Sequence, residues 1–170
     1  MGRWLPHLIG LLTPIATMAG IFVGGWMMGA TIYLALGIYP FLDLIAGKSS
    51  ETDPLEEGKA FNYIVHIHAI LVPIVVIVLL YTAYQEYSSF IWLAAISVGL
   101  SSGASGIVTA HELGHRRPRS VSWWLSRLDL MCVLYLHFTV EHNHTHHKHW
   151  ARPRDPTSSP WGRNVYFHFL

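Results

Sequence analysis

Charged residues and cysteines are both scarce in this sequence. Asp, Glu, Lys and Arg together make up 12% of the 170 residues, about half of the roughly 25% that is usual in soluble domains. Cys132 is the only cysteine, so the chain cannot form an internal disulfide. It also has no Cys-x-x-Cys pair to hold zinc or an iron–sulfur cluster. If the protein carries out redox chemistry, another protein must therefore deliver the electrons.

Hydrophobic residues make up 52% of the chain and occur in long runs instead of helical stripes. A helix needs about 20 mostly apolar residues to cross a bilayer. The sequence offers four such segments, at about 5–24, 25–47, 61–84 and 90–110. The first apolar run is too long for a signal peptide. We therefore predict an all-α, multi-pass membrane protein with about four transmembrane helices.

The segments outside these spans are polar or irregular. Residues 48–59 (KSSETDPLEEGK) predict a loop. Ser120 is suited to cap a new helix over 121–138, and the tryptophans of this helix place it at the membrane interface. From Ala151 onward, repeated prolines indicate irregular structure. The whole chain is expected to form a single domain that ends in a cytoplasmic, histidine-rich segment.

The distribution of basic residues predicts the orientation of the chain. If the N-terminus lies in the cytoplasm, all 11 Lys and Arg residues fall on the cytoplasmic side of the four spans. The two outer turns then carry no basic residue. This is the pattern of the positive-inside rule, and it predicts that the segment after the last span is also cytoplasmic.

Two histidine clusters follow the last predicted span. The first runs from His111 to His115 (HELGH), and the second runs from Glu141 to His147 (EHNHTHH). The chain has 12 histidines in all. Neutral imidazole is the commonest protein ligand for metals and suits iron, zinc and copper. The sequence therefore predicts a metal site at a membrane surface.

The spacing within each cluster suggests which side chains can act together. His111 and His115 are at i and i+4, so they share one face of an α-helix. His142 and His146 have the same spacing. On an α-helix His147 is rotated about 100° from His146, so it can reach around the same cleft or serve a second metal. His144 points away and is expected to be solvated.

Two glutamates lie within the clusters. Glu112 follows His111, and Glu141 precedes His142. Metal-bound imidazoles commonly donate their second N–H to a carboxylate, which fixes the tautomer. We therefore expect Glu112 and Glu141 to support the histidine ligands rather than to bind the metal.

Other functions also fit parts of this pattern. HExxH is the zinc metalloprotease signature, with the glutamate as general base. However, Val121 stands where one protease class has its third histidine, Pro118 ends the helix early, and the second cluster would have no role.

Glu-x-x-His pairs also occur in soluble di-iron bundles, which need further glutamates that the spans lack. A non-enzymatic metal-binding or transport protein is a further alternative, although a transporter should hold its ligands at mid-membrane.

The two clusters together resemble the integral-membrane alkane 1-monooxygenases (alkane hydroxylases), which belong to the fatty-acid desaturase and hydroxylase superfamily. The resemblance lies in HELGH after a span and EHNxxHH about thirty residues further on. Desaturases typically carry HxxHH in the second cluster, whereas HxxxHH after Glu141 favours the alkane hydroxylase branch over a desaturase or fatty-acid hydroxylase. The stretches at 37–47 (GIYPFLDLIAG) and 152–162 (RPRDPTSSPWG) also match.

The resemblance implies a metal centre with two non-haem irons. The ligands that it carries over are His111, His115, His142, His146 and His147. Members of this family also have a third histidine box and two further spans, which this chain lacks. The resemblance therefore implies a fragment that lacks part of the iron site.

The resemblance also implies a reaction and its partners. The implied reaction is hydroxylation of the terminal carbon of medium- or long-chain alkanes with O₂. The implied electron donor is a rubredoxin with its NAD(P)H-dependent reductase. Alkane and membrane lipid are the other expected partners, nucleic acid is not, and the expected location is the bacterial inner membrane.

Overall fold

The structure, a computed structural model, describes residues 4–47, 58–85 and 88–168. The described residues form helices and connecting turns without a β-strand, which confirms the predicted all-α fold. The chain divides into two compact units, Met1–Leu134 and Tyr135–Leu170. Most of the loop predicted at 48–59 lies outside the described residues.

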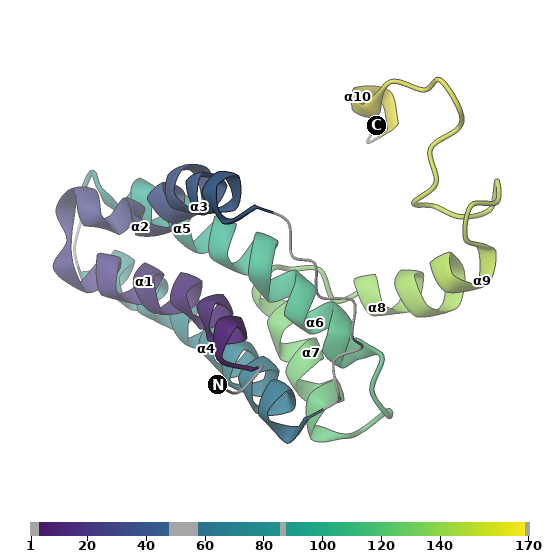
Figure 1. Cartoon of the computed structure of the whole chain (residues 1–170), viewed down its shortest axis with the longest axis horizontal. Helices are drawn as coiled ribbons and strands as arrows, with labels where there is room; N and C mark the ends of the chain where they lie inside the picture. Colours follow the sequence, from purple (N-terminus) through teal and green to yellow (C-terminus); the bar gives the residue numbers. More distant parts are fainter. Residues whose placement is uncertain (1–3, 48–57, 86–87, 169–170) are drawn as a thin grey trace. The chain divides into compact units, whose positions relative to one another are not determined.

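The first unit is a bundle of helices that follow one another along the chain (Figure 1). Its elements are η1 (Leu5–Leu8), α1 (Ile9–Val23), η2 (Gly25–Gly29), α2 (Ala30–Tyr33), η3 (Leu34–Ile38), α3 (Tyr39–Ala46), α4 (Lys59–Gln85), α5 (Ile91–Leu100), η4 (Ser101–Gly106), α6 (Ile107–Gly114) and α7 (Val121–Cys132). The elements η3 and η4 are π-helices, and each joins its neighbours into one continuous helix.

Three continuous helices of the described chain are long and apolar enough to cross a membrane. They are Gly25–Ala46, Lys59–Gln85 and Ile91–Gly114, which match the second, third and fourth predicted spans. The first predicted span forms a shorter apolar helix, α1, because residues Leu5–Leu8 adopt a 3-10 helix before it. Gly24 ends α1 where predicted, with φ at 81°, a left-handed conformation that glycine adopts readily. These helices support an integral membrane protein.

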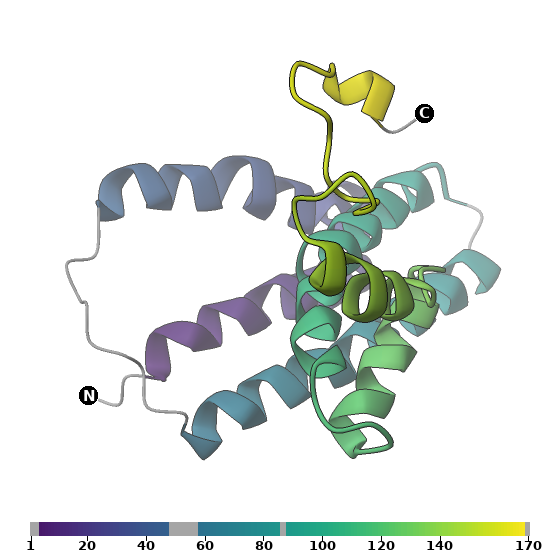
Figure 2. The same ribbon diagram turned by 90° about the vertical axis from the view of Figure 1, so that its right-hand side faces the viewer.

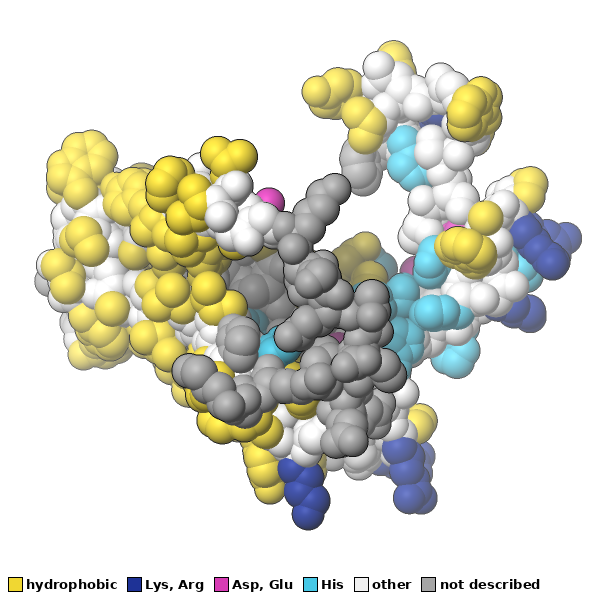
Figure 3. Space-filling model, viewed as in Figure 1, with side chains coloured by type: hydrophobic (Ala, Val, Ile, Leu, Met, Phe, Trp, Pro, Cys, Tyr) yellow, Lys and Arg dark blue, Asp and Glu magenta, His cyan; other side chains and the backbone are white. Residues whose placement is uncertain are grey.

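The outer surface of the first unit is apolar, as a membrane helix requires. Phe22, Leu44 and Trp92 are 75%, 81% and 76% exposed. Figure 3 shows apolar side chains over much of the visible face of these helices, whereas the basic side chains of this unit lie at one end. The exposed apolar surface suits contact with lipid, since the hydrocarbon of a bilayer is itself apolar.

Small and medium apolar side chains form the core where α1, η2, α4 and α5 meet. Its buried members are Ile21, Met28, Val75, Ala94 and Val98. Figures 1 and 2 both show α1 beside α4. In contrast, α3 has no buried residue, and Figure 2 shows it projecting away from α1 and α4.

Two histidines of α4 hold this helix to the helices that follow. The Nε2 atom of His66 lies 2.9 Å from the Ser122 hydroxyl of α7. His68 is buried, and its two ring nitrogens lie 3.1 Å and 3.0 Å from the hydroxyls of Ser105 and Thr109. Since buried polar groups are costly without partners, these bonds fix the position of the helix that carries the first histidine cluster.

Helix α7 begins and ends at identifiable signals. The Ser120 hydroxyl accepts a hydrogen bond from the Trp123 N–H at 3.3 Å, which confirms the predicted N-cap. The predicted helix over 121–138 is too long, because α7 ends at Cys132. Leu134 adopts φ of 56°, a conformation that an α-helix cannot continue through. The Ser126 hydroxyl donates to the Ala110 carbonyl at 2.6 Å, which fastens α7 to α6.

Asp129 of α7 is buried, and both of its carboxylate oxygens are without a hydrogen-bond partner among the described residues. Burial raises the pKa of this carboxyl from 3.8 to about 8. The folded protein therefore keeps a proton that the unfolded chain has already released between about pH 4 and pH 8. Stability should fall as the pH rises through this window, by at most about 1.4 kcal/mol for each pH unit.

Asp129→Asn should abolish most of that pH dependence and raise the stability of the protein near pH 8. The measurement is the thermal midpoint of the detergent-solubilised protein and its variant between pH 4 and pH 8. The two proteins should differ least near pH 4, where Asp129 is neutral in the folded protein and only partly ionised in the unfolded chain. A parent protein that instead gains stability as the pH rises would contradict a neutral, buried Asp129.

The second unit contains short helices and an irregular C-terminal segment. Its elements are α8 (Phe138–Val140), η5 (Glu141–His146), α9 (His147–His149) and α10 (Val165–His168). The first three follow one another directly, and η5 is a π-helix. The chain between α9 and α10 consists of turns and bends, as the prolines predict.

Candidate metal centre

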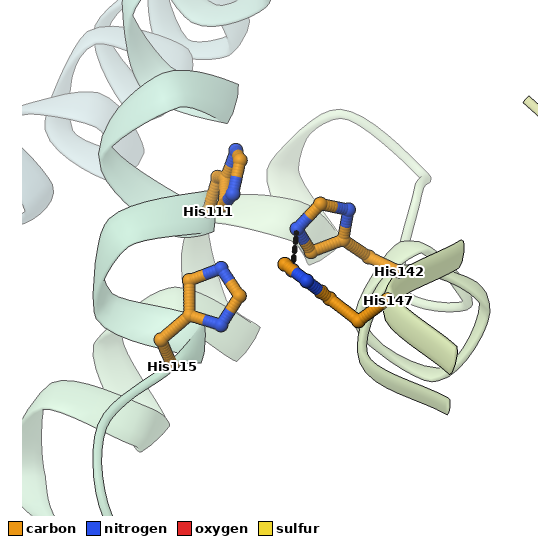
Figure 4. A group of neighbouring side chains, drawn as sticks. All are labelled: His111, His115, His142 and His147. Atoms are coloured by element: carbon orange, nitrogen blue, oxygen red, sulfur yellow. Dashed lines mark hydrogen bonds between the residues drawn. The ribbon is translucent and has the colours of Figure 1, made fainter. Parts of the chain in front are cut away.

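The first histidine pair lies at the end of α6. His111 belongs to the last turn of this helix, and His115 is its C-cap residue. Their ring centroids are 4.9 Å apart, and Figure 4 shows both rings on the same side of the helix. The i, i+4 spacing therefore brings these two side chains together, as the sequence predicts.

Glu112 makes its contact with a different residue. Its carboxylate accepts a hydrogen bond from the Arg116 guanidinium at 2.9 Å, and the two side chains are 56% and 41% exposed. Glu141 is also exposed. The expected bonds from these two carboxylates to histidine rings thus remain a prediction.

The second histidine cluster shows the predicted pair and one closer contact. The sequence predicts an α-helix that places His142 and His146 on one face. The rings of His142 and His146 do stack, with a centroid separation of 5.3 Å. Because η5 is a π-helix, whose backbone bonds join residues five apart, His142 also meets His147. Their Nε2 atoms are 2.9 Å apart, and Figure 4 shows the hydrogen bond between the two rings.

The separation of these two nitrogens suits a shared metal ion. Metal–imidazole bonds are about 2.0–2.1 Å long, so two ligands at a right angle lie about 3 Å apart. One of the two Nε2 atoms must carry a proton to make the bond between the rings. A metal that takes both nitrogens therefore replaces one proton.

His146 lies in the same cluster but has other partners. Its ring stacks against that of His142 with a centroid separation of 5.3 Å. Its Nδ1 atom lies 3.0 Å and 3.1 Å from the two carboxylate oxygens of Asp155 and 2.6 Å from the Thr157 hydroxyl. A carboxylate thus contacts a predicted ligand, but it comes from the loop after α9.

Asp155 is a functional candidate that our reading of the histidine clusters missed. Burial opposes ionisation of its carboxyl group, but hydrogen bonds from Ser158, His146 and Thr157 hold the pKa of Asp155 well below its usual value. The local signal is the order Asp-Pro-Thr-Ser at 155–158. An aspartate followed by such residues commonly accepts hydrogen bonds from the backbone two residues on.

The helix η5 also contains His144. His144 is exposed, as predicted. Each unit therefore presents a cluster of histidines whose ring nitrogens lie close together. The donors are imidazole nitrogens, which suit iron, zinc and copper.

The fold and these clusters define an integral membrane protein of apolar helices with clustered histidines at a helix end. No family model matches the chain. The chain is 30% identical to alkane 1-monooxygenase 1 of Alcanivorax borkumensis, over 96% of the chain and 42% of that relative. It is 30% identical to the alkane 1-monooxygenase of Pseudomonas putida, over 90% and 41%. It is 36% identical to that of Acinetobacter baylyi, over 82% and 35%.

These comparisons confirm the resemblance found in the sequence. The chain is similar to alkane 1-monooxygenases along most of its length, and it spans less than half the length of these relatives.

Proposed function

We propose that this chain is part of a membrane monooxygenase that converts an alkane, O₂, two electrons and two protons into a primary alcohol and water. The observation that carries the proposal is the similarity to alkane 1-monooxygenases over 96% of the chain. The histidine clusters support it, because this reaction needs a metal that can react with O₂. The substrates in the proposal are medium- and long-chain alkanes.

The metal in this proposal is a pair of non-haem irons in the whole protein. Its ligands from this chain are His111, His115, His142, His146 and His147. When bound, iron supplies the O₂ chemistry that protein side chains lack. Glu112 and Glu141 stay in the proposed site as carboxylates beside the ligands.

The membrane helices provide the environment for substrate. An alkane has no polar group, so its recognition must come from the burial of methylene groups, at about 0.8 kcal/mol for each. Helices that face lipid can take an alkane directly from the bilayer. The reacting carbon must then reach the end of α6, where His111 and His115 lie.

The electron donor in this proposal is a rubredoxin with its NAD(P)H-dependent reductase. Cys132 is the only cysteine of the chain, which supports an external donor. A surface hollow of about 630 Å³ is lined by Arg117, Pro118, Arg119 and Ser120, directly after His115. Positive charge at this place would steer an acidic donor toward the histidines.

The proposed location is the bacterial inner membrane, with the N-terminus and both histidine clusters in the cytoplasm. Basic residues follow the end of the α6 span, and the outer turns carry none. This distribution supports the orientation through the positive-inside rule.

The test uses the protein expressed with all of its natural sequence and reconstituted in lipid. We expect each protein molecule to bind a pair of irons. We also expect the protein to form a 1-alkanol when rubredoxin, its reductase, NADH and an alkane are supplied. With ¹⁸O₂, the alcohol should carry one ¹⁸O atom. Desaturation of a fatty acid would assign the protein to the other branch of the superfamily. Bound zinc with peptide hydrolysis would contradict an oxygenase.

A further inference from the structure

Asp155 is held in the second unit by hydrogen bonds to both of its carboxylate oxygens. Its side chain is fully buried. Oδ1 accepts from the Thr157 N–H at 3.0 Å and from the Thr157 hydroxyl at 2.8 Å. Oδ2 accepts from the Ser158 hydroxyl at 2.6 Å and from the Ala151 N–H at 3.2 Å. His146 is the one ring among these partners.

The loop that presents Asp155 adopts a costly backbone conformation. Ala151 has φ of 57°, a region that residues other than glycine, asparagine and aspartate seldom occupy. In this conformation Ala151 directs its N–H to Asp155. Turn hydrogen bonds from Arg152 N–H to the His149 carbonyl and from Asp155 N–H to the Arg152 carbonyl, at 2.8 Å and 2.9 Å, close the loop. The carboxylate is therefore held in one position before any ligand binds.

This arrangement decides which nitrogen of His146 carries the proton. An ionised carboxylate can only accept hydrogen bonds, so Nδ1 of His146 must donate to it. The Thr157 hydroxyl gives its one proton to Asp155, so it also accepts from Nδ1. Nδ1 is thus the protonated nitrogen, and the lone pair of a neutral His146 is on Nε2. This Nε2 makes no hydrogen bond within the described part of the chain.

We propose that Asp155 is a positioning residue that holds His146 as the Nδ1–H tautomer and so presents Nε2 to the metal. The stacking of His146 on His142 keeps that nitrogen in the cluster that contains the His142–His147 pair. A carboxylate in this position also makes the imidazole a stronger donor to a metal. The inference rests on the proposed metal centre, and it assigns to Asp155 the role that Glu112 and Glu141 were expected to share.

The first measurement is binding of Co(II), a spectroscopic substitute for iron, to the protein with its full natural sequence in lipid nanodiscs. Competition with a chelator gives the affinity. Asp155→Asn should lower the affinity by about 10- to 100-fold, the usual effect of losing a carboxylate behind a ligating histidine. Asp155→Glu should restore part of it. Ser159→Ala is the matched control in the same loop, since within the described ranges its hydroxyl bonds only to the Pro160 carbonyl, and it should bind like the parent.

A double-mutant cycle separates positioning from a general effect on the loop. If Asp155 acts through His146, Asp155→Asn should have little further effect on Co(II) affinity in a His146→Ala background. The ¹⁵N spectrum of histidine-labelled protein gives a second readout without metal. The signals that are absent from the His146→Ala spectrum belong to His146. In the parent these signals should show a proton on Nδ1. In Asp155→Asn they should show a mixture of the two tautomers.

Each outcome of these experiments has a distinct meaning. An equal loss of affinity from Asp155→Asn in the parent and in the His146→Ala background would show a structural role and overturn the inference. Metal binding that depends on His142 but not on Asp155 or His146 would also overturn it, while leaving the proposed metal centre intact. A parent protein that binds no Co(II) and no iron would overturn both proposals.

Discussion

Replacing His142 with alanine should abolish iron loading and alkane hydroxylation by the whole protein. In the structure the Nε2 atoms of His142 and His147 are 2.9 Å apart, so the two imidazoles suit two coordination positions of one metal, and alanine at 142 would leave one of these positions empty. The substitution removes a ligand directly. Its effect should therefore exceed the 10- to 100-fold loss that is typical when only a residue behind a ligand is removed.

His144→Ala is the matched control, because His144 lies in the same short helix and is exposed. The measurements are iron content by elemental analysis and formation of 1-alkanol with the donor system supplied. The control should keep its iron and its activity. Unchanged iron in His142→Ala, or an equal loss in both variants, would contradict the assignment of His142 as a ligand.

Replacing Gly20 with alanine should destabilise the first unit strongly. A Cβ atom at this position would lie 2.2 Å from the Met27 carbonyl oxygen and 2.9 Å from the Ala30 Cβ. The Met27 oxygen belongs to the backbone, so it cannot rotate away, and α1 would have to separate from η2 and α2. That movement would also strain the hydrogen bond between Thr17 and Thr31. Overpacking of this kind costs about 1–3 kcal/mol or more.

Gly10→Ala is the control for this substitution. Gly10 lies in the same helix, and a Cβ atom there would meet nothing within 4 Å. Alanine is favoured over glycine in a helix by roughly 0.5–1 kcal/mol, so this variant should be as stable as the parent or slightly more stable. The thermal midpoints of the three proteins in the same detergent test the prediction. Equal midpoints for the two variants would contradict a close contact at Gly20.

The parts of the fold that depend on composition could be predicted from the sequence. The second, third and fourth spans follow from runs of apolar residues that match the thickness of a bilayer. The pairing of His111 with His115 follows from α-helical spacing alone. The Ser120 cap is also a local feature, since the serine hydroxyl needs only the N–H of a residue three positions on.

Other features depend on contacts that no short pattern contains. The burial of Asp129 results from the packing of α7 against α6 and α4, which its own sequence does not specify. The π-helical turn at Glu141–His146 brings His142 to His147 as well as to His146. Such turns are rare within helices, so α-helical spacing alone does not predict the contact with His147. Asp155 lies nine residues after His146, so their contact needs the whole intervening loop to fold back.

The π-helix η5 changes how the spacing of the second histidine cluster should be compared between proteins. A helix that bonds residues five apart can hold one more residue between two side chains than an α-helix, without moving those side chains apart. With HxxxHH wound as in this chain, the first and the last histidine meet. With HxxHH wound as an α-helix, the first and the last histidine would also share a face. An inserted residue can thus be absorbed by the backbone, so two spacings that look different in an alignment can present the same pair of imidazoles.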